Sequence, residues 1–491
     1  MMGRGMRDVG VAAGKIFHAE AQRGGEAERE MRDSGVDWIG KIPEGWEVNF
    51  LSQKVSQVKN RNDGLKEKNL LSLSYGKIKR KSIDSIGGLL PASFEGYNVI
   101  AADDIVLRLT DLQNDQHSLR VGLSRERGIV TSAYTTIRPN FQTDAIFLFY
   151  SLFAFDIVKG FYGMGSGVRQ GLNYDEVKRM VVAIPPLAEQ KAIAEYLDEK
   201  CAAIDAAIAE AKKGIEEYKA WKKSLIFEAV TGKRRVGVFN AETRCARDEV
   251  VGLPERSEPE GPQGAASRRE PEKMKHSGIP WIGAIPEGWK LARLKNCAKV
   301  FGRIGFRGYT TADIVNEGEG ALSLSPSNLK DIRMDYAKRT YISWSKYEES
   351  PEIKVCKGDI VFVKTGSSYG KACIVDDMPC EATLNPQLVV LKCFSCHNRY
   401  LNYYLQTPLI KYQVELIVSG GTIPTMSQEK MGCWKIILPP LSEQQAIADY
   451  LDEKCAAIDA LVAEKEALIA DLEAYKKSLI YETVTGKREV A

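Results

Sequence analysis

The side chains best suited to chemistry in this sequence are hydrogen-bond donors and acceptors gathered in short glycine-containing stretches. A basic stretch led by an aromatic residue contains Tyr75, Lys77, Lys79 and Arg80. A glycine loop further along contains Ser166, Arg169 and Gln170. Cationic side chains can lie along phosphates, and Arg and Gln make paired hydrogen bonds to guanine and adenine edges. Both stretches indicate contact with nucleic acid, although a solvated turn explains the first stretch equally well.

A comparable glycine-containing stretch occurs in the second half of the chain. Its polar and basic members are Lys364, Thr365, Ser367, Ser368, Tyr369 and Lys371. Three further side chains of the same kind follow it: Asn385, Gln387 and Thr422. The recurrence of such residues in both halves favours two separate binding surfaces.

A search for catalytic motifs is negative. TGSSYGKA at 365–372 has the wrong spacing for a phosphate-binding loop. The IPPL and LPPL tetrapeptides lack the Asn or Asp before and the aromatic after that an amino-methyltransferase would place around its target base. Cys393, Cys396 and His397, with Cys380 nearby, form at most half of a zinc site, because no second CxxC follows. We therefore expect no catalytic residue, no metal and no bound cofactor.

Length and composition bound the remaining possibilities. The 491 residues suffice for two or more domains, and a net charge of +3 restricts any nucleic-acid surface to a local patch or one completed by a partner. The most apolar run, at 145–155, is too short to span a bilayer. No secretory signal is visible, and ten Cys in such a chain favour reduced thiols. We expect a cytoplasmic protein.

The elements that must position these side chains come from an internal repeat. Residues 185–234 map onto residues 439–488 by adding 254, without a gap. Each copy has apolar residues spaced three and four apart over some 40 positions, which predicts a rod of roughly 60 Å that pairs with another helix. The two rods most easily run antiparallel, although two unrelated core helices are the alternative. Ser442 and Gln445 fit a capping box at the second start.

A second repeat, offset by 243, precedes each of two blocks that share little sequence, the variable blocks at 47–184 and 290–438. MRDSGVDWIGKIPEGWE begins at Met31 and MKHSGIPWIGAIPEGWK begins at Met274. We expect its Trp residues to anchor a core, with stacking on bases as the alternative. Within each block, short β-rich runs precede a helical stretch, at 145–161 and at 400–417, and a Gly/Ser loop, which indicates an α+β domain in each half.

This order of motif, variable block and long helix, given twice, resembles the specificity subunits of type I restriction–modification enzymes. The resemblance rests on WIGKIPEGW and WIGAIPEGW, on PPLAEQKAIAEYLDEK and PPLSEQQAIADYLDEK, and on the closings KKSLIFEAVTGK and KKSLIYETVTGK. GDIVFVKTGSSYGK and GGTIPTM add to it in the second block, and it covers residues 31–490. It implies a non-catalytic reader of double-stranded DNA, in which each target-recognition domain reads one half of a split site. It further implies docking of two methyltransferase subunits that use S-adenosylmethionine, and of motor-nuclease restriction subunits.

The fold expected on this basis is α+β, with two globular target-recognition domains joined by two long antiparallel coiled-coil helices. The expected boundaries are a disordered extension at 1–30, the first domain at 31–184, the first spacer helix at 185–235, a flexible linker at 236–273, the second domain at 274–438, and the second spacer helix at 439–488. A coiled-coil scaffold whose globular ends bind other proteins is the alternative function. A self-contained nuclease or methyltransferase is opposed by the missing motifs.

Overall fold

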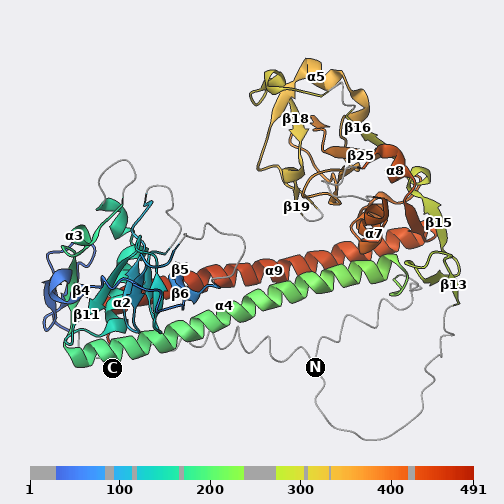
Figure 1. Ribbon diagram of the computed structural model, residues 1–491. Helices are drawn as coiled ribbons and strands as arrows, with labels where there is room; N and C mark the ends of the chain where they lie inside the picture. Colours follow the sequence, from blue (N-terminus) through green and yellow to red (C-terminus); the bar gives the residue numbers. More distant parts are fainter. Residues whose placement is uncertain are drawn as a thin grey trace, which may run out of the picture. The chain divides into compact units, whose positions relative to one another are not determined.

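The computed structural model describes residues 29–82, 93–112, 119–164, 171–236, 273–303, 308–330, 333–417 and 426–490. The chain folds into two compact units. Unit 1 comprises Met1–Gly214 and Glu464–Ala491, and unit 2 comprises Ile215–Ala463. Each unit therefore holds one variable block, the first part of the long helix that follows it, and the last part of the other long helix (Figure 1).

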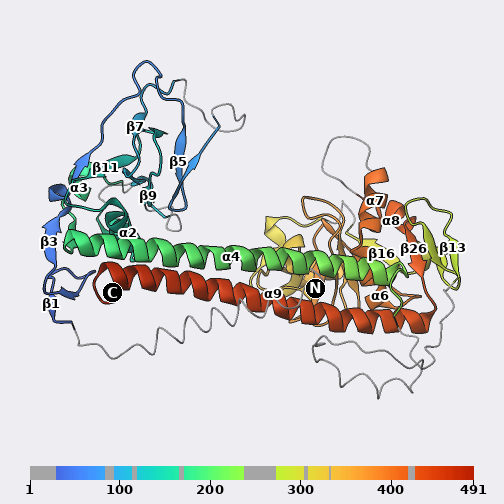
Figure 2. The same ribbon diagram turned by 90° about the horizontal axis from the view of Figure 1, so that it is seen from below.

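The two long helices are α4 (Leu187–Val230) and α9 (Leu441–Val484), each of 44 residues, as the periodicity predicts. Ion pairs between them show that they run antiparallel: Lys476 Nζ lies 2.6 Å from Asp205 Oδ1 in unit 1. Lys222 Nζ lies 2.6 Å from Asp459 Oδ1 in unit 2. The two ion pairs are equivalent positions of the repeat, so the predicted pairing of the two copies is confirmed. Figure 2 shows α4 and α9 side by side in a second view.

The start of each long helix is fixed by a Gln rather than by a capping box. α9 begins at Leu441, so Ser442 lies inside its first turn, and the predicted capping box of Ser442 and Gln445 is wrong. Gln444 Nε2 instead donates to the carbonyl of Pro439 at 2.8 Å, and Gln444 Oε1 accepts from the backbone of His397 at 2.9 Å. Gln190 does the same in unit 1. The Gln of the repeated P-P-L-x-E-Q thus ties each helix start to its own variable block.

Besides its parts of α4 and α9, unit 1 contains short antiparallel strands and a 13-residue helix, α2. Its four-stranded sheet has the order β4-β11-β8-β9, and α2 lies beside this sheet and α4. Four further two-stranded pairs are β1-β2, β3-β12, β5-β6 and β7-β10. The elements are β1 (Met31–Asp33), β2 (Lys41–Pro43), β3 (Glu47–Phe50), β4 (Val55–Gln57), β5 (Leu71–Ser74), β6 (Lys77–Arg80), β7 (Asn98–Ile100), β8 (Ile105–Leu107), β9 (Val121–Leu123), β10 (Gly128–Val130), β11 (Thr135–Pro139), α2 (Ala145–Ile157), α3 (Tyr174–Val177) and β12 (Val181–Ile184).

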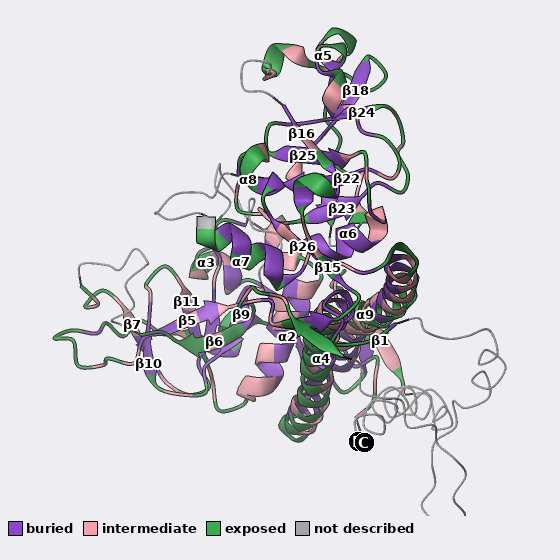
Figure 3. Cartoon of the chain, turned by 90° about the vertical axis from the view of Figure 1, so that its right-hand side faces the viewer, coloured by how far each residue is buried: buried purple, intermediate pink, exposed green. Residues whose placement is uncertain are grey.

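Unit 2 has two four-stranded sheets, β16-β25-β22-β23 and β17-β21-β18-β24, the second with one parallel pair, β18 and β24. Figure 3 shows strands β22, β23 and β25 buried. The elements are β13 (Met274–His276), β14 (Ala284–Pro286), β15 (Lys290–Arg293), β16 (Lys299–Gly302), β17 (Ile314–Val315), β18 (Gly320–Leu324), β19 (Leu329–Lys330), β20 (Arg333–Met334), β21 (Tyr341–Ser343), α5 (Trp344–Glu348), β22 (Ile360–Val363), β23 (Ala372–Ile374), β24 (Ala382–Leu384), β25 (Leu388–Lys392), α6 (Asn398–Leu405), α7 (Pro408–Ile417), α8 (Gln428–Gly432) and β26 (Lys435–Leu438). The single helix predicted at 400–417 is two helices, because Pro408 cannot continue α6 and instead starts α7.

In each unit the motif that contains Trp46 or Trp289 packs against the end of the long helix from the other repeat. Trp46 is buried in the core of unit 1 with the end of α9, and Trp289 is buried in unit 2 with the end of α4. At Gly486 (φ +72°) a Cβ atom would lie 2.3 Å from Pro43 Cδ, and Gly232 meets Pro286 in the same way. The prediction that the Trp residues anchor a core is confirmed for this pair.

Candidate nucleic-acid interface

The basic stretch of the first block forms the β5–β6 hairpin. Tyr75 stands at its tip with a left-handed backbone (φ 48°) and a side chain that is 74% exposed. Lys77 Nζ, however, lies 3.0 Å from Asp205 Oδ2 on α4, and Arg80 pairs with Glu126. One of the cations predicted to bind phosphate therefore holds the hairpin to α4. Among the hairpin residues that the structure describes, Tyr75 and Lys79 are exposed and remain available for contact with a ligand.

Asp205 is shared by two cations in unit 1. Lys77 Nζ donates to one carboxylate oxygen and Lys476 Nζ to the other. Burial opposes ionisation of this carboxyl, but the two ammonium groups outweigh burial and hold the pKa of Asp205 below its usual range. The β5–β6 hairpin, α4 and α9 thus meet at one charged residue.

The predicted loop residues Ser166, Arg169 and Gln170 lie outside the described residues, as does Thr422. Their assignment to a DNA contact remains a prediction. Residues that flank the first loop are described: Leu172 is buried, and its backbone amide donates to the carbonyl of Leu109.

The glycine-containing stretch of the second block connects β22 to β23. Ser367 and Lys371 are exposed, and Tyr369 is half-buried. The backbone amide of Lys364 donates to the carbonyl of Gln387 at 2.9 Å, which brings the two predicted groups together. Thr365 also lies in this connection, between Lys364 and the turn.

The amide side chains predicted in this block also lie together. Asn385 Nδ2 donates to Gln387 Oε1 at 3.3 Å, and Gln387 is exposed. Burial lowers the pKa of Lys364, because the partly enclosed ammonium loses solvation. The exposed amide of Gln387, the half-buried ammonium of Lys364 and the exposed Lys371 therefore lie at one edge of the sheet. Amides read base edges and cations contact phosphates, so this edge can do both.

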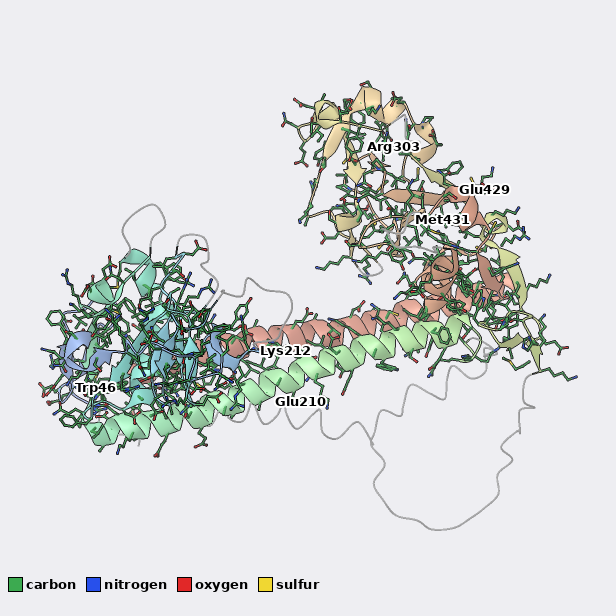
Figure 4. The ribbon with its side chains drawn as sticks, viewed as in Figure 1. Trp46, Glu210, Lys212, Arg303, Glu429 and Met431 are labelled. Atoms are coloured by element: carbon green, nitrogen blue, oxygen red, sulfur yellow. The ribbon has the colours of Figure 1, made fainter. Side chains whose placement is uncertain are left out.

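Arg303 is a residue of this site that the sequence reasoning missed (labelled in Figure 4). It is 4% exposed; its Nε donates to the carbonyl of Leu384 at 3.0 Å and its Nη2 to Thr383 Oγ1 at 3.3 Å. Burial lowers the pKa of its guanidinium. Arg303 thus fixes the strand end that leads to Asn385. The signal in the sequence was an Arg within the stretch FGRIG at 301–305.

Two further kinds of site concern metal ions and membranes. Within the described ranges, no three His, Cys, Asp or Glu side chains are grouped so as to hold a metal ion. Cys396, of the weakly indicated zinc half-site, donates its thiol hydrogen to the carbonyl of Cys297 at 3.8 Å. No helix among the described residues has the length and apolar character needed to cross a membrane.

Comparison with known proteins connects this arrangement to one family. The family model described as the type I restriction modification DNA specificity domain matches residues 307–470. A putative type I restriction enzyme MjaX specificity subunit from Methanocaldococcus jannaschii is 24% identical over 468 residues, 92% of this chain and 96% of that protein. The MjaVIII specificity subunit of the same organism is 22% identical over 457 residues, 92% and 94% of the two chains. The chain is thus similar to type I specificity subunits over 92% of its length.

The fold agrees with that similarity. A solved structure described as the structural basis of complex assembly and conformational transition of the type I R-M system has a TM-score of 0.58. It is 16% identical and covers 91% of this chain and 99% of that chain. This likeness confirms the expected α+β architecture with two long helices. The family-model match spans the β22–β23 connection and the first part of α9, so Lys364, Asn385 and Gln387 lie inside the matched region and Arg303 lies just before it.

Proposed function

We propose that the chain is the DNA-recognition subunit of a type I restriction–modification complex and catalyses no reaction itself. Each variable block reads one half of a split DNA site, and α4 and α9 set the distance between the halves. The observation that carries this proposal is a pair of equivalent anchors that hold two different variable blocks.

The anchors of the two blocks are equivalent residue by residue. Trp46 Nε1 donates to Glu189 Oε1 at 3.1 Å, and Trp289 Nε1 donates to Glu443 Oε2 at 2.9 Å. A second pair repeats in the same way: Tyr150 Oη donates to Asp198 Oδ1 at 2.9 Å, and Tyr403 Oη to Asp452 Oδ1 at 2.7 Å. The mechanical supports are the same in both units while the exposed polar edges differ. Such a design supports two readers of different sequence on one frame.

The reaction itself belongs to partners in this proposal. Two methyltransferase subunits would bring S-adenosylmethionine, and motor-nuclease subunits would add cleavage. This chain would bind no cofactor of its own. Its task is to place the partners on a chosen stretch of DNA.

The test is selection of DNA sites from a randomised library by the complex of the chain with its cognate methyltransferase. Gln387→Ala should cost about 1–3 kcal/mol at one or two positions of a single half-site, because an amide that reads a base edge is lost. Lys371→Ala should weaken binding to all sequences alike. It should also reduce the slope of log binding constant against log salt concentration by about one, as expected for the loss of one phosphate contact.

Lys357→Ala is the matched control, since Lys357 is exposed and lies at the opposite end of β22 from Lys371. It should change neither selection nor salt dependence. Selection of no preferred sequence by the unmodified complex would refute the proposed function. An altered preference in both half-sites after Gln387→Ala would refute the assignment of one block to one half-site.

A further inference from the structure

The sheet edge that carries Gln387 in unit 2 has a counterpart in unit 1. The four-stranded sheets correspond strand by strand, because β8 pairs antiparallel with β9 and β11 as β22 pairs with β23 and β25. The residues paired across these three strands are Val121, Leu107 and Thr135 in unit 1, and Ala372, Phe362 and Val389 in unit 2. The register is the same in both units, so residues beyond the strand ends can be matched one by one.

The connection that follows β8 corresponds to the glycine-containing connection that follows β22. The backbone amide of Arg108 donates to the carbonyl of Arg120 at 2.9 Å. In unit 2 the backbone amide of Val363 donates to the carbonyl of Lys371 at 2.9 Å. Arg120 therefore occupies the position of Lys371.

The residues at the ends of the two glycine loops contact these connections at equivalent places. Leu172 and Met426 lie at the C-terminal ends of the loops at 164–172 and 419–427. The Leu172 amide donates to the carbonyl of Leu109 at 2.9 Å, and the Met426 amide donates to the carbonyl of Lys364 at 3.1 Å. Leu109 therefore occupies the position of Lys364.

A turn before β11 corresponds to the turn that carries Gln387 before β25. The backbone amide of Ala133 donates to Thr131 Oγ1 at 3.3 Å. The backbone amide of Gln387 donates to Asn385 Oδ1 at 3.0 Å in the same way. Ala133 therefore stands at the position of Gln387, and both residues are exposed. Where unit 2 presents an amide, unit 1 presents a methyl group.

The two edges also differ in charge. Unit 1 has the buried Leu109 in place of Lys364, and its connection carries an exposed acid, Asp111. The neighbouring cation, Arg108, is half-buried. A carboxylate can accept a hydrogen bond from the amino group of cytosine but repels phosphates. This edge therefore suits contact with base edges better than contact with the DNA backbone.

Arg120 holds the connection of unit 1 from inside. Lys371 is exposed at the equivalent position, whereas Arg120 is 0% exposed. Its Nη1 donates to the carbonyl of Thr110 at 2.7 Å, and its Nη2 donates to the carbonyl of Asp111 at 3.3 Å. Its Nε donates to Tyr162 Oη at 3.3 Å. One buried cation thus fixes two consecutive carbonyls of the edge.

We propose that this edge of unit 1 reads one DNA half-site and that Ala133 is a specificity-determining residue there. Arg120 is a positioning residue, which acts through the backbone of Thr110 and Asp111. The inference rests on the proposed function and names the residues of unit 1 that carry it out. The methyl group of Ala133 suits the methyl group of thymine, whereas the amide of Gln387 suits the edge of adenine.

The experiment gives the edge of unit 1 the residue type of unit 2. The complex of the full chain with its cognate methyltransferase selects sites from a randomised DNA library, unmodified and with Ala133→Gln. The substitution should shift preference toward adenine by at least about tenfold at one or two positions of one half-site, because Gln pairs with the adenine edge. The other half-site should stay unchanged and should be the one that Gln387→Ala alters.

Ala102→Gln is the matched control. Ala102 is exposed and lies before β8, at the opposite end of this strand from Leu109. It should leave both half-sites unchanged. An unchanged preference after Ala133→Gln would overturn the inference. A shift in the half-site that Gln387→Ala alters would overturn it as well.

Arg120→Lys tests the positioning role. Lys is the residue of unit 2 at this position, and it lacks the planar fork that holds two carbonyls. Discrimination at the positions that Ala133→Gln changes should fall about threefold or more, as expected for the loss of a buried hydrogen bond. The slope of log binding constant against log salt concentration should stay the same, because a buried side chain neutralises no phosphate. Unchanged discrimination, or a slope reduced by about one, would refute the positioning role.

Selection of DNA by the unmodified complex separates this inference from the proposed function. A complex that selects a split site but does not respond to Ala133→Gln refutes only the assignment of this edge. A complex that selects no site refutes the proposed function.

Discussion

Gly486→Ala should destabilise unit 1 by more than its backbone conformation explains. Gly486 has a φ of +72°, and an added Cβ would lie 2.3 Å from Pro43 Cδ and 2.6 Å from Pro43 Cγ. The left-handed backbone costs a residue with a Cβ about 1 kcal/mol. The collision with a rigid Pro ring adds about 1–3 kcal/mol of overpacking. The expected loss is therefore about 2–4 kcal/mol of unfolding free energy.

Gly35→Ala separates the two contributions. Gly35 lies in the same unit with a φ of +69°, and an added Cβ there would meet nothing within 4 Å. Both substitutions restrict the unfolded chain equally, so the difference between them isolates the collision at Pro43. That difference should be about 1–3 kcal/mol.

Hydrogen exchange of the full chain is the suitable assay, because a chain of two units does not unfold in one step. Gly486→Ala should speed exchange in β1, β2 and the end of α9 and leave unit 2 unchanged. Gly232→Ala should do the reverse, since its Cβ would lie 2.5 Å from Pro286 Cγ. If Gly486→Ala and Gly35→Ala lose the same protection, the helix end does not pack on the Trp motif as described.

Two further predictions concern stability and reading. Burial raises the pKa of Asp156 to about 6, and the Arg120 amide and nearby cations oppose this effect only weakly. The cost in stability of ionising this buried carboxyl is therefore absent below about pH 4 and grows as the pH rises through 6. By hydrogen exchange of unit 1, Asp156→Asn should therefore match the unmodified chain near pH 4 and be up to about 3 kcal/mol more stable at pH 7. Equal stability at pH 7 would contradict the buried charge. Seven-residue insertions after Ala211 and after Ile469, which the Asp205–Lys476 ion pair places opposite each other, should lengthen the gap between selected half-sites by about three base pairs. An unchanged gap in a correctly folded complex would mean that the helices do not act as spacers.

The long helices could be predicted because the apolar residues of each helix recur with a period of about 3.6 residues. This signal lies within the sequence of each helix and occurs in both copies of the repeat. Tertiary contacts could not be predicted, because they join residues far apart in sequence. Asp205 binds Lys77 and Lys476, and neither pairing has a local signal. For the same reason the sequence indicated Lys77 and Arg80 as possible phosphate contacts and gave no sign that both are paired within unit 1.

The candidate site was predicted in part. Lys364, Asn385 and Gln387 were identified from their side-chain types, and the structure brings them to one sheet edge. Arg303 was missed because its importance comes from burial beside Thr383, 80 residues away. The break before Pro408 was missed because the stretch at 400–417 was interpreted as one helix, although Pro408 lies inside it.

The exchange of helix ends between the repeats has a consequence for how such a chain could arise. A half-length chain with one motif, one block and one helix would leave its own Trp unsealed, because the residues that cover it come from the other repeat. Two such half-chains could complete each other, with the Asp205–Lys476 contact made twice, as in an isologous homodimer. That ancestor would present two identical readers and select an inverted repeat. Fusion of two such halves into one polypeptide would free each reader to change alone, so that the same frame could recognise a site whose halves differ.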